Sequence, residues 1–146
     1  MKLSYKKSTA RDAEQLFTLC KQLIDKYEDI DSIDYDKVLL WVRRKLARSI
    51  GEYTTVYADG NLAGYYHFFI NEDGEPELDD LYILPEYQSR GIGSEIIKKC
   101  ISLADAPITF YVFKRNQRAI SLYRRLGFEV TETVSDTRYI MKNKQP

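Results

Sequence analysis

Hydrophobic and polar positions recur along this chain with two different periods, one typical of helices and one of strands. Apolar residues repeat at helical spacing over residues 11–27, where Thr9 is a candidate N-cap. They do so again over residues 34–50, where Trp41 and Leu46 belong to the apolar stripe. Two consecutive helices are therefore predicted in the first third of the chain.

The strand-like segments are short runs of β-branched and aromatic residues, separated by turn-forming residues. They cover residues 3–7, 53–58, 62–70, 77–84 and 107–113, and two more are expected within residues 128–142. Between them, helices are predicted after Gly91 and within residues 116–128, the second ending at Gly127. Because helices interrupt the strands unevenly, the pattern predicts a mixed α/β sheet and not a regular doubly wound fold.

Composition limits the classes of function. The 146 residues fit one domain, and 44% hydrophobic content is typical of a folded globular chain. Zero formal net charge gives no support to nucleic-acid binding, and no stretch reaches the roughly 18 apolar residues that a membrane helix needs. The N-terminus has no secretory signal and the two cysteines suggest no disulfide framework, so a cytoplasmic location is expected.

Charge is divided unevenly along the chain. Up to Ile83 there are 16 acids and 11 bases, whereas from Leu84 onward there are 6 acids and 11 bases. This difference in sign predicts a cationic partner for the first part and an anionic partner for the second.

The segment YQSRGIGSEIIKKC, residues 87–100, joins a predicted strand to a predicted helix through Gly91 and Gly93. A loop with little side chain at a helix N-terminus can bring backbone N–H groups close to a phosphate. It is not a P-loop, because no Lys followed by Ser or Thr closes it, and Ile96 stands where a dinucleotide fingerprint needs a third glycine. A glycine-permitted turn without a ligand remains the alternative.

Two motifs together resemble one family. QSRGIG is similar to the Gln/Arg-x-x-Gly-x-Gly/Ala pyrophosphate loop of the GNAT N-acetyltransferase superfamily, and NQRAISLYRRLGF resembles that family's later helix. The resemblance covers nearly the whole chain. It implies an α/β single-domain GNAT-like fold over residues 1–146, with a mixed, mostly antiparallel twisted sheet of about six or seven strands flanked by about four helices.

The resemblance also implies acetyl-CoA as cosubstrate and residues that bind it. Backbone N–H groups of the loop would surround the pyrophosphate, the strand over residues 77–84 would pair with the pantetheine where the sheet splays, and the residue opening the later helix would bind the pantetheine arm. For the arginine of the loop, a solvated charge is the alternative. The predicted cofactor-binding residues are Leu81, Ile83, Gln88, Ser89, Arg90, Gly91, Ile92, Gly93, Ser94 and Asn116.

Acetyl transfer to an amine in a ternary complex needs a base and an acid. An amine with a pKa near 10.4 is neutral in only about one molecule in 2,500 at pH 7. The resemblance places Glu77 and Asp79 where family members carry the base, although both could merely solubilise the strand. Period-two alternation puts these two carboxylates on the face of Leu81 and Ile83, provided no bulge intervenes.

Tyr123 matches the family's tyrosine that protonates the departing thiolate, with a half-buried core aromatic as the alternative. Cys20 and Cys100 lie in helical patterns and are predicted to be structural thiols. His67 stands alone in an apolar strand, so no metal site is expected, and a satisfied structural role is predicted for it.

The acceptor is predicted to be a small cationic amine. The segment over residues 78–96 looks like the spermidine/spermine branch of the family, and acids are concentrated at residues 25–36 and 72–80, which are expected to converge at the acceptor entrance. Modification of a protein amine and a non-catalytic CoA-binding sensor are the alternatives. The oligomeric state stays open, with a homodimer as one option.

Overall fold

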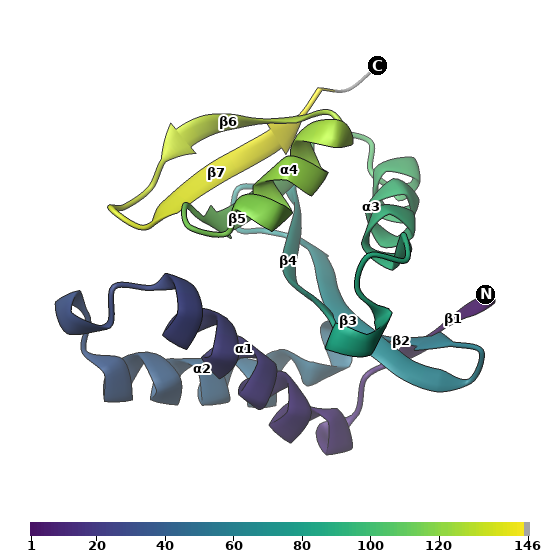
Figure 1. Cartoon of the computed structure of the whole chain (residues 1–146), viewed down its shortest axis with the longest axis horizontal. Helices are drawn as coiled ribbons and strands as arrows, with labels where there is room; N and C mark the ends of the chain where they lie inside the picture. The colour runs from purple at the N-terminus through teal and green to yellow at the C-terminus, as the bar shows by residue number, and fades with distance from the viewer. Residues whose placement is uncertain (145–146) are drawn as a thin grey trace.

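The computed structural model, described for residues 1–144, contains one seven-stranded sheet with the strand order β1-β2-β3-β4-β5-β7-β6 (Figure 1). All neighbouring strands are antiparallel except β4 and β5, which are parallel. This confirms the predicted mixed, mostly antiparallel sheet. The strands are β1 (Leu3–Lys7), β2 (Tyr53–Ala58), β3 (Asn61–Ile70), β4 (Pro76–Ile83), β5 (Thr109–Phe113), β6 (Phe128–Thr133) and β7 (Arg138–Asn143).

Four α-helices accompany the sheet, as predicted: α1 (Ala13–Tyr27), α2 (Tyr35–Ser49), α3 (Ile92–Leu103) and α4 (Gln117–Arg125). The first helix begins later than its pattern suggested. Thr9 caps a 3₁₀ turn, Ala10–Asp12, in which the Asp12 carboxylate accepts the Thr9 N–H at 2.8 Å, and α1 follows that turn.

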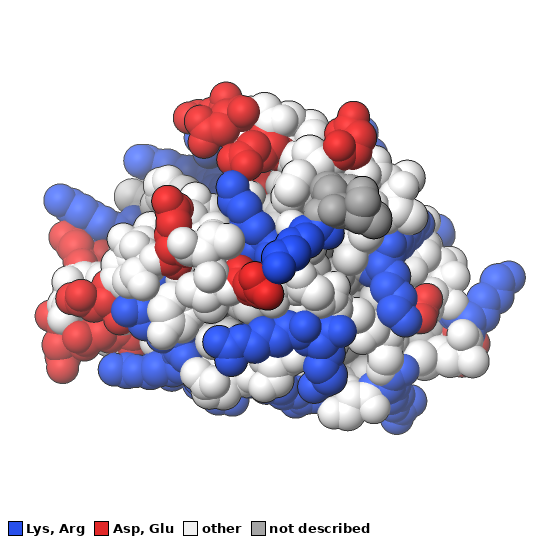
Figure 2. All heavy atoms as spheres, turned by 90° about the horizontal axis from the view of Figure 1, so that it is seen from above, with Lys and Arg blue, Asp and Glu red and all other residues white. Residues whose placement is uncertain are grey.

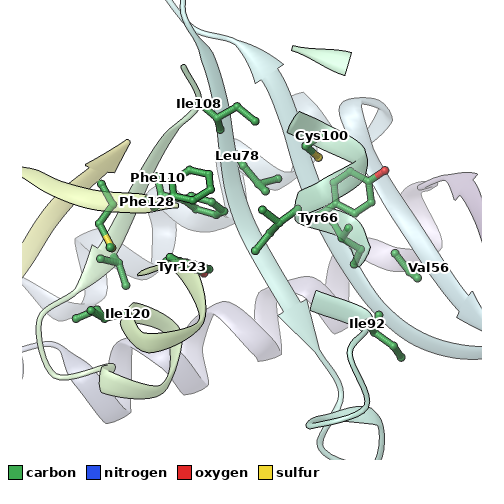
Figure 3. Close-up of a cluster of buried hydrophobic side chains, with 14 of the residues drawn as sticks. Val56, Tyr66, Leu78, Ile92, Cys100, Ile108, Phe110, Ile120, Tyr123 and Phe128 are labelled. Carbon is green, nitrogen blue, oxygen red and sulfur yellow. The ribbon is translucent and has the colours of Figure 1, made fainter. Parts of the chain in front are cut away.

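The helices cover opposite faces of the sheet and create two buried clusters. On one face, α3 contributes Ile96 and Ile97, and α4 contributes Ile120, to a buried cluster that also contains Phe110. Figure 3 shows Ile120 and Phe110 among the members of this cluster. On the other face, α1 and α2 run side by side (Figure 1) and bury a second cluster that includes Leu16. Each fully buried large apolar side chain contributes about 1.5–3 kcal/mol, so both clusters hold the helices to the sheet.

The sheet splays between β4 and β5, as predicted. These strands pair only at Glu77 with Thr109 and at Leu78 with Phe110, and then separate. The cause is a bulge in β4. His67 lies opposite Asp79, but Tyr65, two residues away on β3, lies opposite Tyr82, three residues further along β4.

The bulge is centred on Asp80, whose φ of 48° is left-handed. The bulge overturns the predicted period-two alternation of side chains between the two faces of β4 beyond Asp79. Leu78 and Leu81 both pack on the α3/α4 face, whereas Tyr82 packs among the residues of α1 and α2. Leu81 and Ile83 therefore do not share a face with the two candidate bases, because the inserted residue reverses the pleat.

β3 accommodates the kinked β4 through Gly64, which pairs with Ile83. A Cβ built on Gly64 would lie 2.2 Å from the Tyr82 carbonyl oxygen, closer than real Cβ atoms approach any oxygen. The backbone approach at this point therefore requires glycine.

The surface carries charges of both signs. Figure 2 shows acidic side chains gathered toward one end and the upper edge of this face, while Lys and Arg side chains dominate its lower half. Within residues 1–144, no helix combines the length and the apolar character needed to cross a membrane.

Candidate active site

A groove of about 640 Å³ lies between the loop after β4, α1 and α4. All of the predicted cofactor-binding residues except Arg90 line it: Leu81, Ile83, Gln88, Ser89, Gly91, Ile92, Gly93, Ser94 and Asn116. The charged residues in its wall, among those described, are Lys26, Arg118 and Arg125, all of them basic. The groove thus combines a helix N-terminus with positive charge, which suits an anionic ligand.

The two glycines of the loop serve different purposes. Gly91 has a φ of 83° and is the N-cap of α3, and its neighbour Ser89 is also left-handed, with a φ of 62°. Gly93 lies inside the helix, where an added Cβ would be 3.3 Å from Leu122 of α4. Gly91 therefore sets the loop conformation, whereas Gly93 permits the close packing of α3 on α4.

An arginine that the sequence did not single out ties the loop to α4. Arg118 donates to the Gln88 side-chain oxygen and to the Ser89 hydroxyl, both at 2.7 Å. Gln88 in turn donates to the Ile83 carbonyl at 3.0 Å. By contrast, the Arg90 guanidinium lies over the Tyr87 ring, 5.5 Å from its centroid, outside the groove wall.

A second hollow, a cavity of about 300 Å³, opens between the splayed strands on the α1/α2 side. Its charged wall residues are Lys45, Glu77, Asp79, Asp80 and Arg138. It shares five wall residues with the groove: Leu23, Leu81, Tyr82, Asn116 and Tyr123. The two hollows therefore meet, and both predicted residues of the later helix lie at the junction.

At this junction Tyr123 is held rigidly. Its ring stacks on Phe110 with 4.2 Å between centroids and 14° between planes, and Phe128 lies beside the pair (Figure 3). Burial raises the pKa of the Tyr123 phenol above its usual range, so the hydroxyl stays protonated and able to donate. Asn116 caps α4, its side-chain oxygen accepting the Ala119 N–H at 3.2 Å.

A charge network forms the floor of the cavity. Lys45, from α2, donates to both Asp79 and Asp80, at 3.0 Å in the second case. The hydroxyls of Tyr53 and Tyr82 also donate to Asp80, the latter at 2.9 Å. Asp80 is thus surrounded by donors, whereas Asp79 has Lys45 and the Asp80 N–H.

The two aspartates consequently differ in acidity. Burial and the neighbouring Asp80 charge raise the pKa of Asp79 to about 7, although Lys45 opposes the shift. Burial also acts on Asp80, but Lys45 and the tyrosine hydroxyls outweigh it and lower its pKa below the usual range. Glu77, whose carboxylate accepts from Asn71 at 3.1 Å, has its pKa raised by burial. The pKa of Asp79 therefore lies near neutral pH.

The sequence did contain a signal for Lys45. It lies three and four residues after Val42 and Trp41, on the apolar stripe of α2, where an unpaired ammonium would be costly. A lysine on such a stripe indicates a buried acidic partner. Trp41, predicted as part of the stripe, is instead 59% exposed and lines the cavity.

The environment of His67 differs from the prediction that its polar groups would be satisfied. His67 is buried between Tyr53 and Phe69, with ring centroids 4.4 and 4.2 Å away, but among residues 1–144 neither ring nitrogen has a hydrogen-bond partner. The predicted satisfied role is therefore wrong. Cys20 and Cys100 are buried, as expected of structural thiols, and burial raises the pKa of Cys100 to about 12.

The two acidic stretches do not converge on the cavity. Three acids of residues 72–80 line it, but among the described residues none of those at 25–36 does. Asp29 instead accepts from Ser32 at 2.6 Å, and Glu28 approaches Arg138 at 3.7 Å. The idea of an entrance formed by both stretches is therefore wrong, because the first stretch is used mainly in local caps and ion pairs.

The model of the acetyltransferase (GNAT) family matches residues 13–128. The chain belongs to the GNAT family. Over 54 residues it is 43% identical to thialysine N-epsilon-acetyltransferase of cattle, a match covering 34% of this chain and 32% of that relative. It is 25% identical over 131 residues to the peptidyl-lysine N-acetyltransferase YjaB of Escherichia coli, covering 90% of this chain and 85% of YjaB.

A solved structure has the same fold. The PaiA N-acetyltransferase of Thermoplasma acidophilum, determined in complex with coenzyme A, superposes with a TM-score of 0.72 at 23% identity over 99% of this GNAT chain and 100% of that one. The match with the cattle relative spans only about a third of that protein's length. Membership of the GNAT family agrees with the predicted enzyme class and with acetyl-CoA as the predicted cosubstrate.

Proposed function

We propose that this protein transfers the acetyl group of acetyl-CoA to the primary amine of a small cationic molecule, with both substrates bound together. The observation that carries the proposal is the junction of the two hollows at Tyr123 and Asn116. A basic groove and a partly acidic cavity that meet at a proton donor bring a thioester and an amine into contact.

The groove fits acetyl-CoA on chemical grounds. Its loop presents the N-terminus of α3, and Lys26, Arg118 and Arg125 supply positive charge for the phosphates. The pantetheine arm would follow the splayed edge of β4 at Leu81 and Ile83 toward Tyr123. The anionic partner expected for the second half of the chain is then the cosubstrate itself.

Asp79 is the proposed base. With a pKa near 7 it is partly ionised at neutral pH and still basic enough to take a proton from the acceptor ammonium, directly or through water. The free amine attacks the thioester carbonyl and forms a tetrahedral intermediate. When the C–S bond breaks, Tyr123 gives its proton to the departing thiolate, and the nitrogen of the new amide returns its second proton to the Tyr123 phenolate. Amide and free CoA are the products, and the proton held by Asp79 is then released to solvent.

The walls of the cavity favour a cationic acceptor. Three carboxylates face two basic groups there, so an excess of negative charge remains after Lys45 and Arg138 are counted. A volume of about 300 Å³ suits a side-chain-sized amine. The names of the cattle relative and of YjaB both refer to an amine of the lysine type, which supports a terminal alkylamine.

Acetylation of a lysine within a protein is the second candidate. The observation in its favour is the similarity to YjaB, which extends over 90% of the chain. Exposed Trp41 and Tyr111 at the cavity wall could contact a peptide that flanks the reacting lysine.

An acceptor screen tests the proposal. Purified protein would be incubated with acetyl-CoA and spermidine, free lysine, thialysine, or a lysine-containing peptide, with CoA release followed by a thiol reagent and products by mass. Turnover of a small amine at least 10-fold above the peptide in kcat/KM supports the proposal. Preference for the peptide would favour the second candidate, and acetyl-CoA binding without any turnover would indicate a sensor.

A further inference from the structure

His67, on β3, lies directly opposite Asp79 of β4 and beside it on the sheet. Its Nδ1 is 4.0 Å from an Asp79 carboxylate oxygen, and its Nε2 is 3.8 Å from a Glu52 carboxylate oxygen. His67 lines neither the cavity nor the groove, and its side chain is 4% exposed. Glu52, in the turn before β2, is 60% exposed. The three groups therefore lead from the cavity, across neighbouring strands on the α1/α2 face of the sheet, to solvent.

The imidazole is oriented by its neighbours rather than by hydrogen bonds. Tyr53 and Phe69 stack on its two sides with interplanar angles of 16° and 15°. This stacking points one nitrogen at each carboxylate while leaving both without a partner. Buried polar atoms without partners are rare and costly in folded proteins, so a pair of them beside a candidate base calls for a function.

We propose that His67 and Glu52 carry to solvent the proton that Asp79 removes from the acceptor. This proposal rests on the acetyl transfer proposed above. His67 is then a positioning and relay residue that never touches the substrates.

The transfer balances without any further reactant. The proton on Asp79 passes to the free Nδ1 of His67, while the proton on Nε2 passes to Glu52 and from there to water. A small rotation of either carboxylate shortens the gaps of about 4 Å to hydrogen-bond length. After one transfer the imidazole carries its proton on Nδ1. Rotation of the ring by about 180° between its two stacked neighbours then turns the free Nε2 toward Asp79 and the Nδ1–H toward Glu52, so a second proton can pass.

The electrostatics suit a group that passes a proton but does not retain it. Burial, and next the Lys45 charge, lower the pKa of His67 to about 4, while Asp80 and Glu52 act in the opposite direction. The imidazole is therefore neutral at pH 7, with one nitrogen free to accept and the other able to donate. A permanently charged histidine could not accept a proton from Asp79.

Two variants test the relay. Glu52→Gln changes an exposed side chain and leaves the fold intact, and His67→Phe keeps the stacking but removes both nitrogens. Each should lower kcat about 10-fold in dilute buffer, which is less than the roughly 10²- to 10⁴-fold expected for loss of the acid or base itself. Added imidazole or concentrated buffer should restore much of the loss in Glu52→Gln, and affinity for acetyl-CoA should not change.

The control is Glu14→Gln, which removes an exposed carboxylate that pairs with Arg43 at 2.8 Å and lines neither hollow. It should retain the wild-type kcat and show no dependence on buffer concentration. If Glu52→Gln matches the control in both measurements, the relay is wrong even where wild type is active. If wild type itself acetylates no amine in the screen, the proposed function is what fails.

Discussion

The groove and the cavity meet at Tyr123 but are built in different ways. The groove contains one stretch of nearly consecutive wall residues, from Gln88 to Ser94, while α1 and α4 supply its charged wall residues, which among those described are all basic. The cavity is assembled from side chains of α1, α2, α4, β4, β5 and β7, with charges of both signs. The loop of the cosubstrate groove can therefore be recognised in one short segment of sequence, whereas the charged groups of the acceptor site come together only when distant segments pack.

This difference predicts which measurement each kind of variant will affect. Changes in the groove should alter the affinity for acetyl-CoA, and changes in the cavity should alter turnover. If single variants in either hollow reduce acetyl-CoA affinity and turnover equally, the two hollows act as one site.

The largest effect is expected from Tyr123→Phe. It removes the proposed proton donor but keeps the ring that stacks on Phe110, so turnover should fall roughly 10²- to 10⁴-fold. Acetyl-CoA affinity, measured by calorimetry, should change little. Full turnover in a folded variant would mean that the thiolate leaves without this phenol.

Asp79→Asn should reduce kcat/KM by about 10²-fold, because the base is lost while Lys45 keeps Asp80 as a partner. In the wild type, kcat/KM should rise with pH and level off above an apparent pKa of about 7. Glu77→Gln is the matched comparison and should lose less than about 10-fold. A larger loss of kcat/KM in Glu77→Gln than in Asp79→Asn would instead identify Glu77 as the base.

Gly91→Val should weaken acetyl-CoA binding about 10-fold, because a β-branched residue at a φ of 83° distorts the loop. Gly60→Val is a close control. Gly60 has a φ of 84° in the β2–β3 turn, and a Cβ at either glycine meets nothing within 4 Å. Both variants should lose similar stability, and equal loss of acetyl-CoA affinity would remove the loop from the site.

The smallest effect concerns stability. Because the folded-state pKa of Asp79 is raised to about 7, the folded protein holds a proton that the unfolded chain has lost above pH ~4. Its contribution to the unfolding free energy therefore falls as pH rises, by about 2 kcal/mol between pH 5 and pH 7. The lowered pKa of Asp80 affects the unfolding free energy only at pH values below this range of pH 5 to 7.

Urea denaturation at these two pH values measures the difference. Asp79→Asn should lose the pH-dependent part, whereas Asp105→Asn, at an exposed loop position after α3, should keep it. If the unfolding free energy of Asp79→Asn falls between pH 5 and pH 7 by as much as that of the wild type, this carboxyl has an ordinary pKa in the folded protein.

Much of the fold could be predicted because its signals are local. The apolar stripes of α1 and α2, the turn at Asp59 and Gly60, and the loop between β4 and α3 each lie within one short segment. Even the splay of β4 from β5 followed from the family resemblance. Helix boundaries were less accurate, since the 3₁₀ turn before α1 depends on the Asp12 side chain reaching back to Thr9.

The cavity could not be predicted in the same way. Its network joins Lys45 to Asp79 across 34 positions and Tyr53 to Asp80 across 27, and no local pattern encodes such distances. The bulge at Asp80 adds a second difficulty, because one inserted residue changes the face of every side chain after it. Both features depend on packing that only the folded chain reveals.

Gly64 limits how the acceptor specificity of this protein could be engineered. Trp41 and Tyr111 can be varied to reshape the cavity wall, since both are substantially exposed. The path of β4 is a different matter, because even alanine at position 64 would collide with the Tyr82 carbonyl and push the kinked strand away from β3. Libraries aimed at new acceptors should therefore hold codon 64 fixed, although this residue touches neither substrate.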